Sequence, residues 1–523
     1  MPTTALADAT QGLALRSLNG KDYRLEGDGD GALLARLVGP LSGFGELLMV
    51  EPLPRVQIDA TYGILTTDVE TFTASGGSAT ASGGVFSTAT GVSSGAYGMI
   101  RSRRMVRYRA GQALRVRFTA MFSAGVASGL QGAGMFTATD GIFFGRSGTS
   151  FGLFRRIAGA CSIYRLTITN GATGAENMTI TLNSTAVVVA SGGALSTAAT
   201  AERIAEVGVF TGWTSTVSPT SNGATVTFIQ QVPAATGGAF SFSSSGGATG
   251  TLAEVQAGAA NDNATGFVVQ TAWNVDRMDG SGGAYNPSGE TIDPTKLNVY
   301  EVLYPHLGAG TIVFRVMTPR GRWQTVHRIE YPDSATIPSQ RSPTMRVGWF
   351  AASLGSTTNI TTSGVSAALF VDGNPPSSAR DPYSTTRVNF SAGTTEYAAL
   401  CIRSRGEFSS TVNLREVVPV SINGANETAN RAVRVRVLVN PTLTGTVDWS
   451  YVDQSTSCVE VATPATITPS GGREVASGSL ATATTIELDK LDLRLEPGDV
   501  LVVALTTASS TAACNVGVNW QER

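Results

Sequence analysis

The chain has 523 residues, of which 42% are hydrophobic and 15% are charged, and its formal net charge is −2. This length predicts roughly two to four domains, and the hydrophobic content excludes a disordered chain. The small net charge argues against a general affinity for nucleic acid or anionic membranes. The sequence contains no run of about 20 apolar residues, so we expect no membrane insertion.

The first region, residues 1–66, contains little Gly-Ser sequence and several Leu-rich pieces. LALRSLNGKDYRLEG predicts two short strands around an Asn-Gly turn, and DGALLARLVGPL predicts a short helix stopped by Gly39 and Pro40. Its opening residues have neither the basic nor the apolar part of a signal peptide, so we expect a protein made in the cytoplasm. We interpret the region as an anchoring segment.

From residue 67 the sequence becomes typical of β structure, because runs of Thr, Val, Phe and Tyr alternate with Gly-rich turns. We assign 67–160 plus 267–375 to one large β-sandwich domain, with a three-stranded meander over 299–331. The sequence pattern changes in 161–266, where we expect short strands and one amphipathic helix, TAATAERIAEVGVF. We interpret 161–266 as a small α+β module inserted into a loop of the large domain.

The remaining region, residues 383–523, follows a Pro/Ser/Gly-rich linker, GNPPSSARDP, and predicts a second β-sandwich. In NRAVRVRVLVN, four valines alternate with Arg434, Arg436 and Leu438, which predicts a half-buried strand. Further strands follow at the rhythm of about 8–12 residues that is typical of sandwiches and barrels. The expected fold class is mostly β: modular β-sandwich or jelly-roll domains with a small inserted α+β module and an N-terminal anchoring segment.

The large domain contains five long motifs: IRSRRMVRYRAGQALRVRFTAMF (100–122), DGIFFGRSGTSFGLFRR (140–156), QTAWNVDRMDGSG (270–282), NPSGETIDPTKLNVYEVLYPHLGAGTIVFRV (286–316) and HRIEYPDSATIPSQRSPTMRVGW (327–349). The C-terminal region from about 385 ends in LEPGDVLVVALTTASS and VNWQE. The five motifs resemble a family of virion structural proteins of tailed phages, which also resembles virion proteins of giant viruses. The C-terminal region resembles a sandwich that often follows this domain in phages.

The resemblance implies a tail-fibre or spike subunit, of the receptor-binding type, that attaches to the phage particle through its N-terminal region. The expected partners are other phage tail or head proteins, a host-surface glycan or protein, and further copies of the chain in a homotrimer. The expected location is the virion, assembled in the bacterial cytoplasm and released by lysis. Two alternatives stay open: a head decoration or other minor virion protein, and a glycan-degrading tailspike enzyme.

Seven arginines form the main charge feature, because no acid occurs from Thr71 to Thr139. Guanidinium groups suit carboxylates, phosphates and aromatic faces. One hypothesis is contact with an anionic partner or with acids of a neighbouring subunit. The alternative is a solvated strand face balanced by acids from elsewhere in the fold. The residues are Arg101, Arg103, Arg104, Arg107, Arg109, Arg115 and Arg117.

Catalytic patterns are weak, so we expect no enzyme and no cofactor. The two histidines, His306 and His327, lie in a predicted turn and a predicted strand and are interpreted as structural. The candidate carboxylate pairs, Asp276 with Asp279 and Glu290 with Asp293, lie in Gly-rich loops that favour a role in turns. EGDGDG and NVDRMDGSGG are weak candidates for calcium loops, and no metal site is assigned.

The four cysteines are far apart, and none forms a C-x-x-C pair, which argues against a zinc site. We expect free, buried thiols, and a Cys458–Cys514 bridge stays open as an alternative.

Overall fold

The computed structural model describes residues 14–16, 22–24, 54–108, 110–157, 159–220, 223–260, 266–372, 381–409, 411–445 and 447–522. The chain divides into two units, Met1–Glu51 and Pro52–Arg523. In the first unit, β1 (Ala14–Arg16) pairs antiparallel with β2 (Asp22–Arg24), which confirms the two predicted strands. The helix predicted in DGALLARLVGPL lies outside the described residues.

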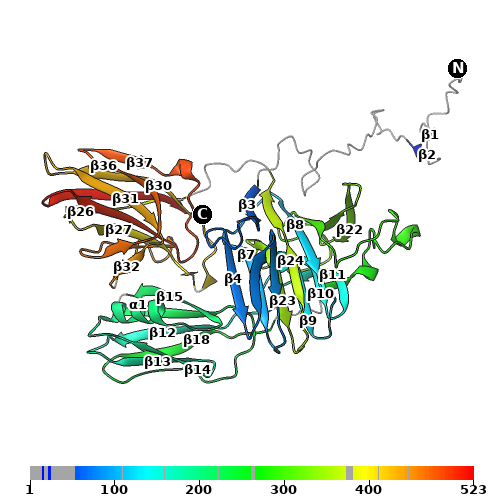
Figure 1. Ribbon diagram of the computed structural model, residues 1–523, viewed down its shortest axis with the longest axis horizontal. Helices are drawn as coiled ribbons and strands as arrows, with labels where there is room; N and C mark the ends of the chain where they lie inside the picture. Colours follow the sequence, from blue (N-terminus) through cyan, green and yellow to red (C-terminus); the bar gives the residue numbers. More distant parts are fainter. Residues whose placement is uncertain are drawn as a thin grey trace, which may run out of the picture. The chain divides into compact units, whose positions relative to one another are not determined.

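The large sandwich consists of two antiparallel sheets (Figure 1). The first has the order β19 (Phe267–Val269), β11 (Ser150–Arg156), β10 (Gly141–Ser147), β9 (Gly129–Phe136), β23 (Arg346–Ser353), β7 (Tyr97–Ser102) and β4 (Val69–Ala74). The second has the order β22 (Trp323–Ile329), β21 (Ile312–Met317), β20 (Asn298–Tyr304), β8 (Leu114–Phe122), β24 (Thr361–Gly364), β6 (Val85–Ala89) and β5 (Ser78–Ser82), with β25 (Ser366–Val371) pairing β8 and β3 (Pro54–Asp59).

Aromatic side chains from both sheets fill the core of the large sandwich. Phe144 of β10 lies 4.6 Å, between ring centroids, from Tyr300 of β20, and Phe118 of β8 stacks on Tyr300 at 5.5 Å. All three are buried, so the core depends on strands that are far apart in the sequence. The strands β20, β21 and β22 pair in chain order, which confirms the meander predicted over 299–331.

The boundary expected at residue 66 is wrong for this sandwich, because β3 already belongs to it. Residues 56–59 of β3 pair antiparallel with β25, and Val56 and Ile58 point into the core with 4% and 3% of their surface exposed. Pro54 stands at the first position of the strand, where a missing N–H is tolerated. The prolines of this segment therefore do not keep its last residues out of a sheet.

The chain leaves the large sandwich after β11 and returns at β19, and these two strands pair directly. Between them lie two sheets, β15 (Trp213–Thr220), β16 (Gly223–Gln230), β12 (Ile163–Asn170) and β18 (Thr249–Gln256), and β14 (Thr185–Ala190), β13 (Asn177–Leu182) and β17 (Ser241–Ser244).

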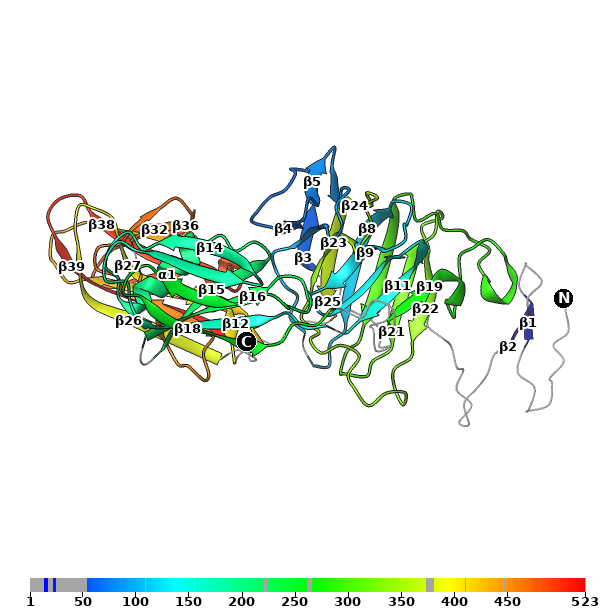
Figure 2. The same ribbon diagram turned by 90° about the horizontal axis from the view of Figure 1, so that it is seen from below.

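Helix α1 (Thr197–Val207) confirms the helix predicted in this module and contacts β12, β15 and β16 (Figure 2). The Ser196 side chain accepts a hydrogen bond from the backbone N–H of Ala199 and so caps the first turn. Ile204 of the helix packs with Leu166 and Phe228 in a core formed by the module's own residues. The module therefore has a hydrophobic core of its own.

The C-terminal sandwich also has two antiparallel sheets around one core. The first has the order β26 (Asp381–Ala392), β39 (Ala512–Glu522), β30 (Val417–Asn426) and β37 (Thr484–Glu487). The second has the order β33 (Ser450–Tyr451), β34 (Val459–Ala462), β27 (Tyr397–Ser404), β38 (Val500–Thr507), β31 (Val433–Val439) and β36 (Arg473–Leu480).

Short elements complete this domain. Two small ladders join β28 (Glu407–Phe408) to β29 (Thr411–Val412) and β32 (Thr442–Thr444) to β35 (Thr468–Ser470), and the 3-10 turn η3 covers Asp489–Leu491.

Strand β31 shows how the sequence pattern becomes structure. Val433, Val435 and Val437 are fully buried in the core, and Arg434 on the other face is exposed, as predicted. Leu438 shares the face of the arginines yet is buried, because it belongs to a second cluster that includes Trp449. The mostly β, modular fold class is thus confirmed. In the described part of the chain, no helix has the length and apolar character needed to cross a bilayer.

Candidate functional site

The long connection from β19 to β20 forms the candidate site, which we call the 273–297 loop. It follows the 3-10 turn η1 (Gln270–Ala272) and contains a second turn, η2 (Gly283–Tyr285). Buried anchor residues alternate with exposed polar residues along it. The buried anchors are Trp273, Asp276, Met278, Asn286 and Ile292.

Asp276 connects two parts of the loop, one on each side of η2, through its buried side chain. Its side chain is fully buried, and its two carboxylate oxygens accept hydrogen bonds from the backbone N–H groups of Met278 (2.9 Å) and Ser288 (3.0 Å). A buried carboxylate needs such donors to offset its lost hydration. The sequence placed Asp276 in a candidate catalytic pair, but the structure gives it this bracing role.

Asp279 lies at the exposed surface of the same loop. Its Oδ1 accepts hydrogen bonds from the Ser281 hydroxyl (2.6 Å), the Ser281 N–H (2.9 Å) and the Asn286 amide (3.1 Å). These bonds, that of the Ser281 side chain first, lower the pKa of Asp279 to about 2, so the carboxylate is ionised at neutral pH. Among the described residues none donates to Oδ2, which leaves one acceptor oxygen open.

Tyr285 is the exposed aromatic residue of the loop, with 63% of its surface accessible. The guanidinium carbon of Arg277 lies 4.1 Å from the centroid of its ring, so one face of the ring is covered by a cation. The backbone N–H of Arg277 also donates to the Tyr285 carbonyl at 2.9 Å. No acid of the described residues forms an ion pair with Arg277, in contrast to the arginines discussed below.

His327 of β22 holds the base of the loop. Its Nδ1 accepts a hydrogen bond from the backbone N–H of Asn274 at 3.1 Å, and the Asn274 side chain bonds both backbone groups of Arg328. Burial lowers the pKa of His327 to about 4, so the ring is neutral and can accept at Nδ1. The structural role expected for His327 agrees with this geometry.

The second carboxylate pair is also tied to turns. Asp293 accepts hydrogen bonds from the N–H and the hydroxyl of Thr295, and Glu290 lies 3.8 Å from the guanidinium of the exposed Arg320. Within the described ranges, no group of three His, Cys, Asp or Glu side chains could hold a metal ion. The calcium loop suggested by EGDGDG lies outside the described residues.

The predicted arginine row is paired within the chain. Six of its members form ion pairs with acids of other segments, and Arg109 lies outside the described residues. This geometry favours the alternative in which acids from elsewhere in the fold balance the row, while pairing with another subunit stays a prediction. The pairs are Arg101–Glu70, Arg103–Asp499, Arg104–Asp492, Arg107–Glu496, Arg115–Asp372 and Arg117–Glu301.

His306 and the cysteines occupy packed interiors. Nδ1 of His306 lies 2.5 Å from the Tyr304 hydroxyl, and its ring packs edge-on against Tyr108. All four cysteines are free and buried, so the prediction of free thiols is confirmed and the alternative Cys458–Cys514 bridge does not form. Burial raises the pKa of the Cys161 thiol to about 11 and of the Cys401 thiol to about 12.

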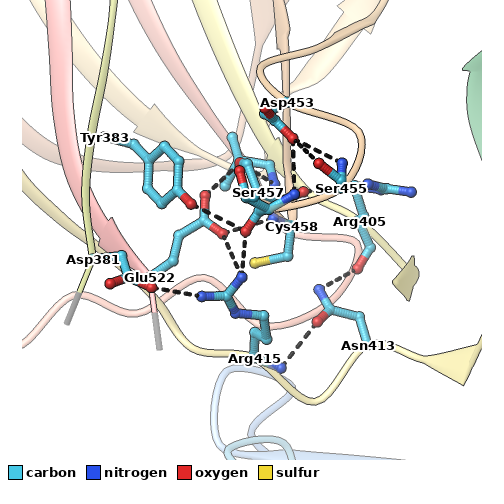
Figure 3. Close-up of polar contacts among 12 residues, drawn as sticks. Asp381, Tyr383, Arg405, Asn413, Arg415, Asp453, Ser455, Ser457, Cys458 and Glu522 are labelled. Carbon is cyan, nitrogen blue, oxygen red and sulfur yellow. Dashed lines mark hydrogen bonds and ion pairs between the residues drawn. The ribbon is translucent and has the colours of Figure 1, made fainter. Parts of the chain in front are cut away.

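A separate polar network lies within the C-terminal sandwich, around the fully buried carboxylate of Glu522 (Figure 3). Glu522 accepts hydrogen bonds from the Ser457 hydroxyl (2.5 Å), the Cys458 N–H (2.6 Å) and the Trp520 indole N–H (2.9 Å). Arg415 approaches the same carboxylate at 3.7 Å and reaches Asp381 at 3.3 Å. The network fastens the end of β39 to the turn that precedes β34, which is a structural role.

Sequence reasoning did not single out Tyr285, Arg277 or the Glu522 network. The available signal for Tyr285 was an aromatic residue inside a Gly-rich stretch, GSGGAYNPSG, where no core position is expected. Glu522 carried no such signal, because two of its three donors, Ser457 and Cys458, lie about 65 residues earlier in the chain.

No protein-family model and no curated protein sequence matches the chain. Among solved structures, the metal-free carbohydrate recognition domain of Emp46p aligns at 7% identity with a TM-score of 0.21, over 59% of this chain and 89% of that one. Arcelin-5, a lectin-like defense protein from Phaseolus vulgaris, aligns at 9% identity with a TM-score of 0.23, over 61% and 99%. At such scores these likenesses carry no argument about this chain.

Proposed function

We propose that the protein is a non-enzymatic structural protein of a tailed-phage virion, a tail-fibre or spike subunit that displays β-sandwich domains to the host surface. The proposal rests mainly on how the described domains are constructed. Three β-rich bodies each bury a core of their own, and a long surface loop is held rigid by internal hydrogen bonds. Rigid sandwiches that carry ordered loops suit binding, because the scaffold positions the loops without ordering cost.

The sequence motifs that resemble phage virion proteins support the same assignment. Attachment to the particle falls to the N-terminal region in this proposal, since residues 1–51 form a unit separate from the sandwiches. Trimerisation would multiply a weak contact with the host surface, because linked sites bind with an increased effective concentration.

The experiment that tests the proposal is to detect and locate the chain in purified virions. Mass spectrometry of purified particles should find it, and electron microscopy with a gold-labelled antibody should place it on the tail. A label on the capsid would instead support a head decoration protein. Absence from the particles would refute the virion assignment, and degradation of host polysaccharide by the purified chain would support a tailspike enzyme.

Truncation tests the orientation of the subunit. A chain lacking residues 1–51 should stay soluble, because β3 and the sandwiches remain intact, but should not be incorporated into particles. A chain ending at residue 372 should be incorporated. The reverse result would place the attachment site in the C-terminal sandwich.

A further inference from the structure

We propose that Tyr285, Arg277 and Asp279 of the 273–297 loop form a binding subsite for a neutral pyranose ring of a surface polysaccharide. The inference deepens the proposed function and rests on it for the biological source of the sugar. It combines three features of one loop: an exposed aromatic ring of set orientation, a guanidinium that pairs with no acid of the described residues, and a carboxylate oxygen to which none of the described residues donates.

The ring of Tyr285 offers the stacking surface. Arg277 covers one of its faces at 4.1 Å, and 63% of the tyrosine surface stays accessible. The C–H groups on one side of a pyranose form an apolar face that can pack on the negative face of an aromatic ring. A tyrosine loses little conformational freedom on binding, and here the contact with Arg277 already restricts its ring.

Asp279 and Arg277 supply the polar contacts. Each sugar hydroxyl both donates and accepts hydrogen bonds. The open Oδ2 of Asp279 is an ionised acceptor, and Arg277 provides donors that no acid of the described residues occupies. The charges of the two side chains cancel, which favours a neutral sugar over a polyanion.

The loop is organised before any ligand arrives. Asp276 braces its two parts on either side of η2, Asn286 bonds both Asp279 and the carbonyl of Glu290, and Asn274 ties its base to β22. Gly282 and Gly283 precede Tyr285 with φ angles of +69° and +73°, a conformation that other residues rarely adopt. Binding therefore orders few groups, so more of the contact energy contributes to affinity.

The test uses the full-length chain and a printed array of neutral hexose, N-acetylhexosamine and acidic-sugar oligosaccharides. Titration calorimetry then measures the affinity for the strongest array ligand. Tyr285→Ala should weaken it by about tenfold or more, because a central aromatic contact is lost, and Tyr285→Phe should keep most of it. Asp279→Asn should also weaken binding, since Oδ1 can still hold the Ser281 turn while the open acceptor becomes a donor.

Tyr62→Ala is the matched control, because Tyr62 is 81% exposed in the same sandwich but lies in another loop, and it should bind like the wild type. Circular dichroism and thermal unfolding confirm that each variant is folded. Equal affinity of the Tyr285→Ala and Tyr62→Ala variants would overturn the inference. Binding to acidic sugars alone would overturn the assignment of a neutral ligand.

The sugar array tests the subsite and the virion experiment tests the proposed function, so either one can be refuted without the other. A chain that is present in virions and adsorbs to host cells but binds no arrayed sugar would refute the subsite and leave the proposed function standing. A chain that is absent from virions but loses sugar binding on Tyr285→Ala would support the subsite and refute the phage role.

Discussion

Replacing Glu522 with glutamine should loosen the C-terminal sandwich, and the geometry predicts by how much. The two side chains have the same shape, so the change removes a charge and one acceptor without opening a cavity. In the wild type, Oε1 accepts from Ser457 and Trp520. Oε2 accepts from Cys458 and faces Arg415 (Figure 3).

Neither orientation of the glutamine amide satisfies this site. If the glutamine NH₂ takes the Oε2 position, this donor faces two other donors, the Cys458 N–H and the Arg415 guanidinium. With the NH₂ at the Oε1 position, the Ser457 hydroxyl can turn and accept, but the indole N–H of Trp520 cannot. Each orientation leaves a buried donor without an acceptor, which costs about 1–3 kcal/mol. Loss of the charge opposite Arg415 adds to this, so we expect a total of about 3 kcal/mol.

Hydrogen–deuterium exchange with mass spectrometry measures the effect in the intact chain, whose several domains exclude a two-state treatment. A change of about 3 kcal/mol corresponds to exchange on the order of 100-fold faster for protected amides of β39 and its partners β26 and β30. Strands of the large sandwich should exchange as in the wild type and serve as an internal reference.

Asp381→Asn is the matched control, because Asp381 contacts the same Arg415 but is 72% exposed at its side chain. An exposed ion pair contributes about 0–1 kcal/mol, so β39 should exchange less than about tenfold faster. If Glu522→Gln changed the exchange of β39 no more than Asp381→Asn does, the buried network would not hold the end of this strand.

Two further predictions concern titratable groups. The free thiols should resist Ellman's reagent at pH 8 in the native chain and react fully in denaturant, because burial raises the pKa of Cys161 and Cys514 to about 11; rapid native reaction would contradict this. Burial also raises the pKa of Glu202 on α1 to about 7 despite its ion pair with Arg403 at 3.1 Å. Its contribution to stability is therefore fully present below pH 4.5 and is lost as the pH rises through 7. The unfolding temperature of the Glu202→Gln variant, relative to that of the wild type, should therefore rise between pH 5 and pH 8.

Local patterns in the sequence determined much of the fold. The alternation of Val433, Val435 and Val437 with arginines predicted strand β31, and the meander predicted over 299–331 formed as β20, β21 and β22. Helix α1 and the mostly β class followed from periodicity in the same way. Such features depend on residues within a few positions of each other, so the chain carries them without reference to its tertiary contacts.

The tertiary structure alone decided the roles of the polar residues. The acids that pair with the arginine row come from segments as distant as Asp499. Two donors to the Glu522 carboxylate, the Ser457 hydroxyl and the Cys458 N–H, come from the turn before β34. Asp276 and Asp279 look alike in the sequence, yet one is a buried brace and the other an exposed, ionised acceptor. Burial and the direction of neighbouring donors set these differences, and both arise only when strands that are far apart in the chain pack together.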